Sequence, residues 1–571
     1  MADIKHRGLS VVLCGPAGTG IQTVEQLLMQ MFSLSGFHVF ATKEYMSRVR
    51  GGMNSTSIRV SDVPVRCAVE RIDILIPLSK GAAGHLGGRI GAETLIIAEK
   101  ENLEDGFDFS QYRVIDVPFS QIAADIGNKI YSNIVAVGLL ASLFGIELST
   151  VADFISKRFA GKDQSVIAQN ISAAGAGFDI GGKLAGQKGL KFDIKPDPAA
   201  KGRMLVSGIE ALGLGCIAAG CNFIGAYPMS PSTGLLTFLA KQAERFGIVV
   251  EQAEDEIAGI NMALGAWYAG ARAIASTSGG GFALMCEGVS LAGMIESPLV
   301  VHIAQRPGPA TGLPTRTEQG DLELALYAGH GEFPRAIFAP GNVEQGFEFA
   351  QRAFDLADRC QSPVFILTDQ YFVDSYYDAA RFDVSGVKVE HHFVQTGENY
   401  RRFALTDDGV SPRGIPGYGE GLVVVDSDEH DEEGHITEDL YLRVKMVDKR
   451  LKKFELLKQA AVEPTLWPAG DFRTLVICWG STRTVVEEAL ALLGRDDVAM
   501  LHFGQVWPIH PKTAEYAKKA KRIICIEGNA TGQFAKLLKL HQGIKVDEQI
   551  LKYNGLQFTV EEVMKHLTRI A

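Results

Sequence analysis

The sequence predicts an α/β protein built from three doubly wound, parallel-sheet domains. Short apolar runs alternate with helical segments along most of the chain, a pattern typical of parallel sheets covered by helices on both faces. The composition of the 571 residues, with 46% hydrophobic, 22% charged and 62 glycines, is that of α/β enzymes rather than of disordered or fibrous proteins. A chain of this length forms roughly three or four compact domains.

The first domain is expected over residues 1–190. Its strands are expected at 9–15, 39–42, 57–60, 72–77, 94–98 and 113–116, with a helix at 21–32 after the first of them. The apolar run 134–146 falls short of the ~18 to 20 residues that cross a bilayer, so a buried helix is expected there. Residues 181–202 are rich in Gly, Lys and Pro, which predicts a solvated linker and a domain boundary.

The second domain is expected over residues 205–383, the connector over 384–458 and the third domain over 459–571. Strands of the second domain are expected at 223–226, 273–276, 299–303 and 364–368, and those of the third begin at 474, 498 and 522. The connector contains an acidic loop at 426–435 and a charged helix at 438–458. His430 and His435 in that loop could bind a metal ion, but their spacing matches no recognised ligand set, and a solvated loop is the preferred interpretation.

Charge and cysteine usage limit the possible partners. The net charge of −11 disfavours nucleic acid and anionic membranes, because both bind concentrated basic patches. The first residues lack the apolar core and cleavage site of a signal peptide, so a cytoplasmic protein is expected. The eight cysteines are scattered and form no C-x-x-C pair, so no iron-sulfur cluster or structural zinc is expected on this chain.

Four unusual segments follow predicted strands of the second domain. They are Tyr-Pro-Met-Ser-Pro-Ser-Thr (227–233), Glu-Asp-Glu (254–256), Ser-Thr-Ser-Gly-Gly-Gly (276–281) and the segment that begins with Gln305-Arg306 (305–315). The two prolines of the first segment stiffen a loop that presents hydroxyl groups, with helix capping as the alternative. The glycines of the third segment allow a ligand to approach closely.

Glu256 and Arg306 are the charged residues of most interest in these segments. Glu256 begins an apolar helical segment (257–270), so burial is expected to favour its protonated form. The alternative is that the acidic cluster only complements the helix dipole. The guanidinium of Arg306 could bind a carboxylate with two parallel hydrogen bonds, with a structural salt bridge as the alternative.

The order and spacing of these segments resemble the pyrimidine-binding domain of the 2-oxoacid:ferredoxin oxidoreductases. These thiamine diphosphate enzymes cleave a 2-oxoacid and pass electrons to an iron-sulfur protein. The resemblance implies that Glu256 is the catalytic carboxyl, which hydrogen-bonds N1′ of the aminopyrimidine. It implies that Tyr227, Pro228 and Ser230 contact the cofactor and that Ser230 and Arg306 contact the substrate. The family more usually has threonine where Ser230 stands, so this chain keeps the hydroxyl and lacks a methyl group.

The N-terminal domain resembles the gamma domain of the same family. The resemblance rests on a glycine turn (15–20) and on residues 42–54, in which Gly52 and Asn54 are expected near the active site and coenzyme A. Lys43, Arg48 and Arg50 would face an anionic substrate or the coenzyme phosphates, although an exposed basic loop is nearly as good an interpretation. The third domain resembles a transketolase C-terminal-like domain.

A Gly-Asp-Gly motif with a following asparagine, which usually binds Mg²⁺ and diphosphate, is absent from the sequence. The resemblance therefore implies a fused gamma-alpha subunit, completed by a beta subunit that carries Mg²⁺, diphosphate and a [4Fe-4S] cluster. The expected reaction converts a 2-oxoacid, coenzyme A and oxidised ferredoxin into acyl-coenzyme A, CO₂ and reduced ferredoxin. The favoured substrate is 2-oxoglutarate, because the cations of residues 43–50 could bind a second carboxylate. Pyruvate, branched-chain and aryl 2-oxoacids remain open, as does a non-catalytic assembly subunit.

Overall fold

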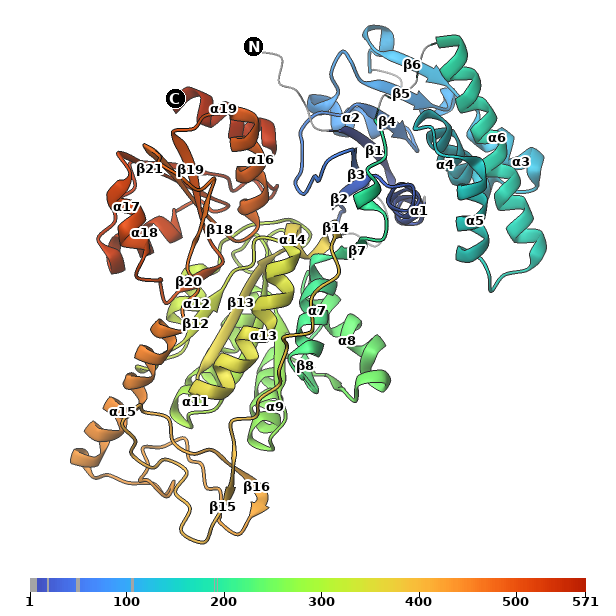
Figure 1. Cartoon of the computed structure of the whole chain (residues 1–571). Helices are drawn as coiled ribbons and strands as arrows, with labels where there is room; N and C mark the ends of the chain where they lie inside the picture. Colours follow the sequence, from blue (N-terminus) through green and yellow to red (C-terminus); the bar gives the residue numbers. More distant parts are fainter. Residues whose placement is uncertain are drawn as a thin grey trace. The chain divides into compact units, whose positions relative to one another are not determined.

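The computed structural model describes residues 8–17, 20–47, 52–103, 107–188, 190, 192 and 194–570. The chain forms two compact units. Unit 1 comprises residues 1–206, 375–381 and 559–562, and unit 2 comprises residues 207–374, 382–558 and 563–571. Helices alternate with sheets rich in parallel strands in both units, which confirms the predicted α/β class (Figure 1).

Unit 1 contains an eight-stranded sheet with the order β6-β5-β4-β1-β3-β2-β14-β7. The strands are β1 (Leu9–Pro16), β2 (His38–Glu44), β3 (Met53–Ser61), β4 (Ile74–Pro77), β5 (Leu95–Ala98), β6 (Arg113–Asp116), β7 (Met204–Ser207) and β14 (Tyr376–Ala379). Strands β1, β4, β5 and β6 pair in parallel. By contrast, β3 is antiparallel to both β1 and β2, and β14 is antiparallel to β2. The short connection between β2 and β3 has no room for a crossover helix, so these strands pair as antiparallel neighbours.

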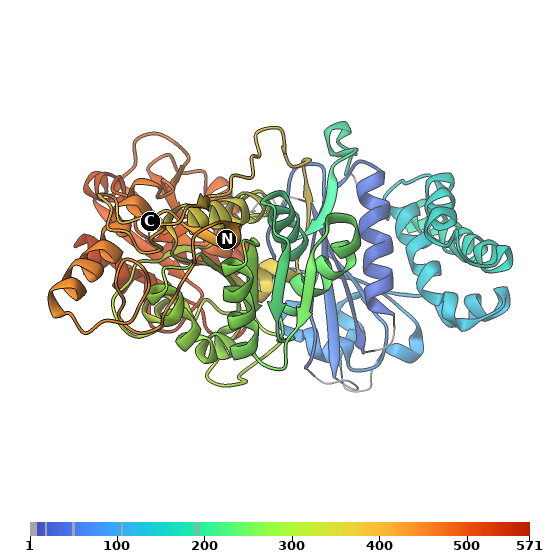
Figure 2. The same ribbon diagram turned by 90° about the horizontal axis from the view of Figure 1, so that it is seen from below.

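The helices of unit 1 include a layer beyond α1, on the side away from the sheet (Figure 2). The α-helices of this unit are α1 (Ile21–Leu34), α2 (Ala82–Leu86), α3 (Phe119–Ile126), α4 (Ser132–Leu143), α5 (Leu148–Arg158) and α6 (Gln164–Lys188). Helix α4 is the buried helix that the apolar run predicted. Helix α6 continues through Lys188, so the linker predicted from residue 181 onward is wrong for its first part.

The glycines of α6 have a packing role instead. A Cβ at Gly177 would lie 1.9 Å from the carbonyl oxygen of Val135 in α4, and one at Gly138 would lie 1.9 Å from the carbonyl oxygen of Ala174 in α6. The two backbones therefore approach more closely than any side chain allows. Glycine content alone does not separate this arrangement from a flexible linker.

Unit 2 contains a seven-stranded sheet with the order β20-β12-β13-β11-β10-β8-β9. The strands are β8 (Phe223–Ala226), β9 (Val249–Gln252), β10 (Ala273–Thr277), β11 (Leu299–Gln305), β12 (Ala336–Phe338), β13 (Pro363–Asp369) and β20 (Gln505–Trp507). All pairs from β12 to β9 are parallel, and β20 is antiparallel to β12. The helices associated with this sheet include α7 (Gly208–Ala218), α8 (Thr233–Phe246), α9 (Glu256–Tyr268), α10 (Gly279–Leu284), α11 (Cys286–Met294), α12 (Leu322–Tyr327), α13 (Val343–Cys360) and α14 (Gln370–Asp374).

A five-stranded sheet in the same unit has the order β17-β19-β18-β21-β22. Its strands are β17 (Thr465–Trp467), β18 (Thr474–Trp479), β19 (Val498–Phe503), β21 (Arg522–Glu527) and β22 (Glu548–Leu551). Three of its helices are α16 (Arg483–Leu493), α17 (Thr513–Lys519) and α18 (Gln533–Gln542). Gln319, in the loop after β11, donates to the carbonyl oxygen of Trp479 at 2.8 Å and accepts from the backbone of Gly528 at 2.8 Å. The smaller sheet thus fixes the loop that follows Arg306.

The connector contains a two-stranded sheet of β15 (Val394–Thr396) and β16 (Gly414–Gly419), followed by α15 (Leu440–Gln459). Lys449 and Lys453 of α15 are buried and pair with the buried Glu296, with a Lys449 Nζ to Glu296 Oε1 distance of 2.7 Å. Burial raises the pKa of Glu296, but Lys453, Lys449 and Arg402 outweigh it and lower that pKa to about 2. Three charged residues of α15, Lys449, Arg450 and Lys453, are therefore packed inside unit 2, whereas others such as Arg443 and Glu455 remain exposed.

His430, predicted in a solvated loop, is completely buried against Phe403, with 3.8 Å between ring centroids. No cluster of three or more His, Cys, Asp or Glu side chains suited to a metal ion occurs within the described residues. Within that same part of the chain, no helix combines the length and apolar character needed to cross a membrane.

Gly177→Ala and Gly175→Ala form a matched pair that tests the contact between α4 and α6. The first substitution should lower the free energy of unfolding by ~1 to 3 kcal/mol, because the new methyl group meets the Val135 carbonyl. The second should be neutral or stabilising by up to ~1 kcal/mol, because a Cβ at Gly175 meets no atom within 4 Å and alanine favours the helix. Urea unfolding of both variants measures the difference, and equal effects would contradict the close packing.

Candidate functional site

The four segments singled out from the sequence follow four adjacent strands of one parallel sheet. They come after β8, β9, β10 and β11, which are neighbours in the order β11-β10-β8-β9. Parallel strands end at the same edge, where open α/β sheets bind their ligands. The topology thus brings Ser230, Glu256, Gly281 and Arg306 to one edge of the sheet.

Glu256 is the first residue of α9 and its side chain is only 3% exposed. The neighbouring Asp255 is the helix cap, and its carboxylate accepts from the backbone N–H of Ala258 at 2.7 Å. The carboxyl oxygen Oε1 of Glu256 is buried and has no hydrogen-bond partner among the described residues. Asp255 therefore caps this helix, and the carboxyl group of Glu256 is not used for capping.

The glycine turn at the start of α10 leaves space beside this carboxyl group. A Cβ at Gly281 would lie 2.5 Å from Glu256 Oε1 and 2.1 Å from Thr277 Oγ1. A Cβ at Gly279 would lie 2.2 Å from Asp321 Oδ1. Two carboxyl groups from other loops thus pack directly against the turn, which only glycine permits.

Arg306 is half-buried at the end of β11, and its Nη1 donates to the carbonyl oxygen of Ser230 at 2.7 Å. Its Nε is buried and has no hydrogen-bond partner among the described residues. Burial lowers the pKa of Arg306, which the negative charges of Asp321 and Glu256 partly offset. The guanidinium is therefore oriented by the loop of Ser230 and retains a donor for an anion.

The loop after β8 exposes Tyr227 and Ser230 but not every hydroxyl group. Ser230 is exposed, Pro228 is half-buried and Tyr227 is 40% exposed. Ser232 is buried, and its hydroxyl donates to the carbonyl oxygen of Met229 at 2.7 Å instead of capping α8. The capping alternative thus does not account for Ser232, and Ser230 remains available to a ligand.

Helix α9 is less buried than its apolar sequence predicted. Ile257, Met262 and Tyr268 are 44%, 41% and 36% exposed, whereas Ile260, Leu264 and Trp267 are buried. The helix packs against β8, β10, α10 and α11, but Ile257, Met262 and Tyr268 remain exposed. The prediction of a fully buried helix is therefore wrong for this chain in isolation.

Asp321 is a residue of this site that the sequence analysis did not select. Burial and then the nearby Glu318 raise the pKa of Asp321 to about 7, against the opposing effect of Arg306. Its Oδ2 is buried and has no hydrogen-bond partner among the described residues. The signal in the sequence was an aspartate shortly before an apolar helix, which ordinarily indicates a simple cap.

Candidate residues of the N-terminal region lie in unit 1. Lys43 Nζ is 3.6 Å from the buried carboxylate of Glu25 and 4.6 Å from the ring centroid of Tyr376, so its charge already has a partner. Gly52 has a φ of 84°, and Asn54 Oδ1 accepts from the backbone of Met46 at 3.1 Å. Arg48 and Arg50 lie outside the described residues.

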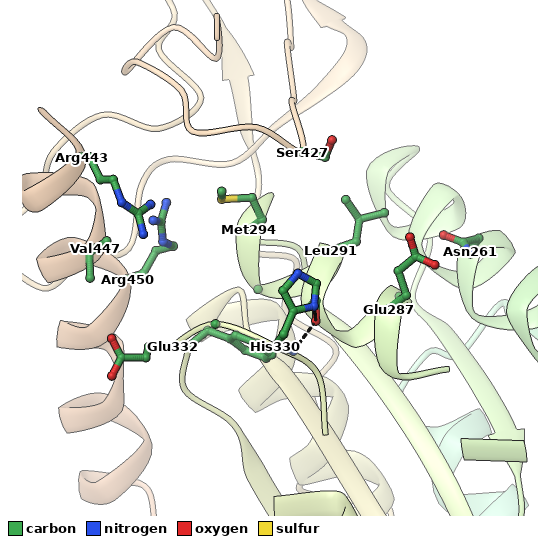
Figure 3. Close-up of a pocket in the computed structure, with 15 residues that line it drawn as sticks. Asn261, Glu287, Leu291, Met294, His330, Glu332, Ser427, Arg443, Val447 and Arg450 are labelled. Atoms are coloured by element: carbon green, nitrogen blue, oxygen red, sulfur yellow. Dashed lines mark hydrogen bonds between the residues drawn. The ribbon is translucent and has the colours of Figure 1, made fainter. Parts of the chain in front are cut away.

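A separate hollow of about 660 Å³ in unit 2 lies among α11, residues 330–333 and α15 (Figure 3). Arg443 and Arg450 point toward it from α15, but both pair with Glu429. His330 Nδ1 is 3.1 Å from the hydroxyl of Ser290. The residues that line this hollow are not those of the sequence motifs, so the site at the strand ends remains the better candidate.

Two protein-family models match the chain. Residues 214–449 match "Pyruvate flavodoxin/ferredoxin oxidoreductase, thiamine diP-bdg", and residues 10–180 match "Pyruvate ferredoxin/flavodoxin oxidoreductase". The first match contains all four strand-end segments. The fold and the site therefore define a thiamine diphosphate-binding oxidoreductase. The buried, unpartnered oxygen of Glu256 and the glycine turn beside it fit such a cofactor.

Curated relatives and a solved structure match along nearly the whole chain. A 2-oxoacid:ferredoxin oxidoreductase alpha subunit of Sulfolobus sp is 31% identical over 98% of this chain and 97% of its own length. The 2-oxoglutarate oxidoreductase subunit KorA of Mycobacterium tuberculosis is 28% identical over 96% of this chain and 89% of its own length. The structure of 2-oxoglutarate:ferredoxin oxidoreductase from Magnetococcus marinus, with 2-oxoglutarate, coenzyme A and succinyl-CoA bound, matches with a TM-score of 0.91 at 29% identity over 99% of this chain and 100% of the matched chain. The chain belongs to the 2-oxoacid:ferredoxin oxidoreductase family, as an alpha subunit.

Gly281→Ala and Gly280→Ala test whether the glycine turn maintains the site. Gly281→Ala should lower thiamine diphosphate content and activity at least ~10-fold, because its methyl group would displace Glu256. Gly280→Ala should retain both within about twofold, because its Cβ has only one neighbour within 4 Å, at 3.6 Å. Cofactor content and initial rates of the assembled enzyme check the prediction, and full activity of Gly281→Ala would refute it.

Proposed function

We propose that this chain, with a beta subunit, oxidatively decarboxylates 2-oxoglutarate to succinyl-coenzyme A and CO₂ and reduces ferredoxin. The observation that carries the proposal is the buried, unpartnered Glu256 carboxyl beside a glycine turn, with Arg306 following the adjacent strand β11. The Mycobacterium relative, a 2-oxoglutarate oxidoreductase subunit, and the Magnetococcus structure, which contains bound 2-oxoglutarate, support 2-oxoglutarate as the substrate. A purely structural assembly subunit would not need this combination of groups.

Glu256 is the proposed catalytic residue. Bound thiamine diphosphate would supply a carbon nucleophile that attacks the oxo carbon and then stabilises the negative charge left by decarboxylation. The carboxyl of Glu256 would hold a proton at N1′ of the pyrimidine ring, and its burial excludes water from that hydrogen bond. Tyr227 and Pro228 would contact the cofactor, while the Ser230 hydroxyl would contact both cofactor and substrate.

Arg306 is the proposed group for the carboxylate next to the oxo carbon. Its Nη1 is committed to the Ser230 carbonyl, which fixes the plane of the guanidinium. The buried Nε has no hydrogen-bond partner among the described residues, so a carboxylate bound there would satisfy it. A charged hydrogen bond of this kind is stronger than a neutral one.

The distal carboxylate and coenzyme A are assigned to groups in the N-terminal region. Because Lys43 pairs with Glu25, Arg48 and Arg50 are the better candidates for the second carboxylate of 2-oxoglutarate. Gly52 and Asn54 are proposed to lie near coenzyme A. Pyruvate, branched-chain and aryl 2-oxoacids would need no such second cation and remain the competing substrates.

The beta subunit is proposed to cover the strand-end site. Four apolar or aromatic residues in or next to the site segments are 40% to 51% exposed, which leaves apolar surface around a site that must exclude water: Tyr227, Ile257, Leu284 and Leu313. The beta subunit would also supply Mg²⁺, the diphosphate site and the [4Fe-4S] cluster. In this chain seven of the eight cysteines are buried and the eight are dispersed along the sequence, an arrangement that does not suit a cluster.

Glu256→Gln should abolish turnover without loss of the fold or the cofactor. The amide has nearly the same shape as the carboxyl but cannot shuttle the proton, so kcat should fall by ~100-fold or more. Hydrogen–deuterium exchange at C2 of bound thiamine diphosphate should slow by a similar factor. Asp255→Asn is the matched control, because it keeps the helix cap and should change the rate little. Normal exchange in Glu256→Gln would eliminate the assignment.

The assembled enzyme should have a higher kcat/KM for 2-oxoglutarate than for pyruvate, whereas the chain alone should be inactive and free of iron. Arg50→Met should reduce kcat/KM for 2-oxoglutarate by ~10 to 100-fold and affect pyruvate much less, because one charged hydrogen bond is lost. Lys43→Met is the comparison variant: loss of the Glu25 partner should affect both substrates alike. Viologen reduction by the parent and both variants provides the measurement, and a preference for pyruvate would overturn the substrate proposal.

A further inference from the structure

We propose that Asp321 controls by its charge how strongly Arg306 binds the substrate carboxylate, so that the affinity for the 2-oxoacid falls as Asp321 ionises. This proposal rests on the proposed role of Arg306 in the reaction. Asp321 itself is a positioning residue, because it acts through the guanidinium rather than on the reacting atoms. Three features of Asp321 support the assignment: its position, the charged groups near it and the absence of a capping hydrogen bond from its side chain.

The backbone holds Asp321 in a fixed position beside the glycine turn. Its N–H donates to Gln305 Oε1 at 3.0 Å, and Gln305 Nε2 donates to the carbonyl oxygen of Thr368 at 3.1 Å. The side chain lies so close to Gly279 that a Cβ there would be 2.2 Å from Oδ1 and 2.3 Å from Oδ2. The carboxyl group therefore occupies the space that a side chain at residue 279 would need.

Asp321 precedes α12 as its N-cap residue, yet its side chain makes no capping hydrogen bond. Aspartate at this position normally accepts from a backbone N–H of the first turn. Here Oδ2 is buried and has no hydrogen-bond partner among the described residues. The ordinary structural reason for an aspartate at a helix start is thus absent.

The charged groups that act on Asp321 are Glu318 and Arg306. Arg306 attracts the carboxylate and Glu318, in the same loop, repels it. Glu256, at the start of α9, also acts on Arg306. Glu323 in α12 is paired with Lys536 at 3.1 Å, so its charge is compensated. An incoming carboxylate must therefore compete with Asp321 for the positive charge of Arg306.

The competition depends on pH in one direction. The pKa of Asp321 is raised to about 7 by burial, so the group is mainly neutral below that pH and mainly anionic above it. With Asp321 neutral, the charge of Arg306 is directed to the substrate and KM is low. When Asp321 is anionic, its charge partly neutralises that of Arg306, so the substrate carboxylate binds more weakly. If binding requires neutral Asp321, KM rises by up to ~10-fold per pH unit.

The test is the pH dependence of KM for the 2-oxoacid in the assembled enzyme, at saturating coenzyme A and electron acceptor. In the parent, KM should rise about fivefold or more between about pH 6.5 and 8.5. In Asp321→Asn it should stay low and change less than about twofold over the same range. Ionisation of coenzyme A and of the acceptor is the same for both enzymes. The ratio of the 2-oxoacid KM of the parent to that of the variant therefore reports only the effect of Asp321. A parallel rise in both enzymes would overturn the proposal.

Two further variants keep the result interpretable. Glu318→Gln removes a charge that repels the Asp321 carboxylate, so the pH at which KM rises should be lower than in the parent. An unchanged transition would count against the proposal even if Asp321→Asn fails to fold.

Arg306→Lys tests the proposed role of Arg306 in substrate binding. If it raises KM at every pH while Asp321→Asn keeps the parent slope, only the role of Asp321 is wrong. If it leaves KM unchanged, the role of Arg306 in the proposed function is wrong.

Discussion

The parallel pairing of β9, β8, β10 and β11 is the constraint on which the candidate site depends. Because these neighbours run in one direction, the loops that follow them meet at a single edge, although they span residues 227–321 of the sequence. Each loop contributes one kind of group: a hydroxyl, a buried carboxyl, a glycine turn and a guanidinium. Reversal of any one strand would move its loop to the opposite edge of the sheet.

Close approach to glycine is used in both units for different purposes. In unit 1, Gly138 and Gly177 let the backbones of α4 and α6 touch, which is a matter of packing. In unit 2, Gly279 and Gly281 let the carboxyl groups of Asp321 and Glu256 lie against the start of α10. In both cases the glycine is required by its neighbour rather than by backbone flexibility.

Unit 2 contains two kinds of buried carboxyl group, those paired in structural ion pairs and those whose partners are incomplete. Glu296 is satisfied by two buried lysines, and its pKa is lowered to about 2 as a result. Asp321 is also buried, but Arg306 only partly opposes its desolvation, and its pKa is raised to about 7. A buried charge with complete partners stabilises a fold, whereas a buried charge with incomplete partners marks a site where another group completes the set.

The sequence by itself determined the α/β class, most strand positions and the residues at the strand ends, because these follow from local patterns of apolar residues, prolines and glycines. Strands 113–116 and 223–226 were predicted to the residue, and Glu256 follows from its place before an apolar helical segment. Only the tertiary structure decided whether glycines meant a linker or helix packing, since both need the same residue. It also decided that Lys449 and Lys453 are buried and that the Asp321 side chain makes no capping hydrogen bond to the helix that follows it. These features depend on partners distant in the sequence, which no local pattern reports.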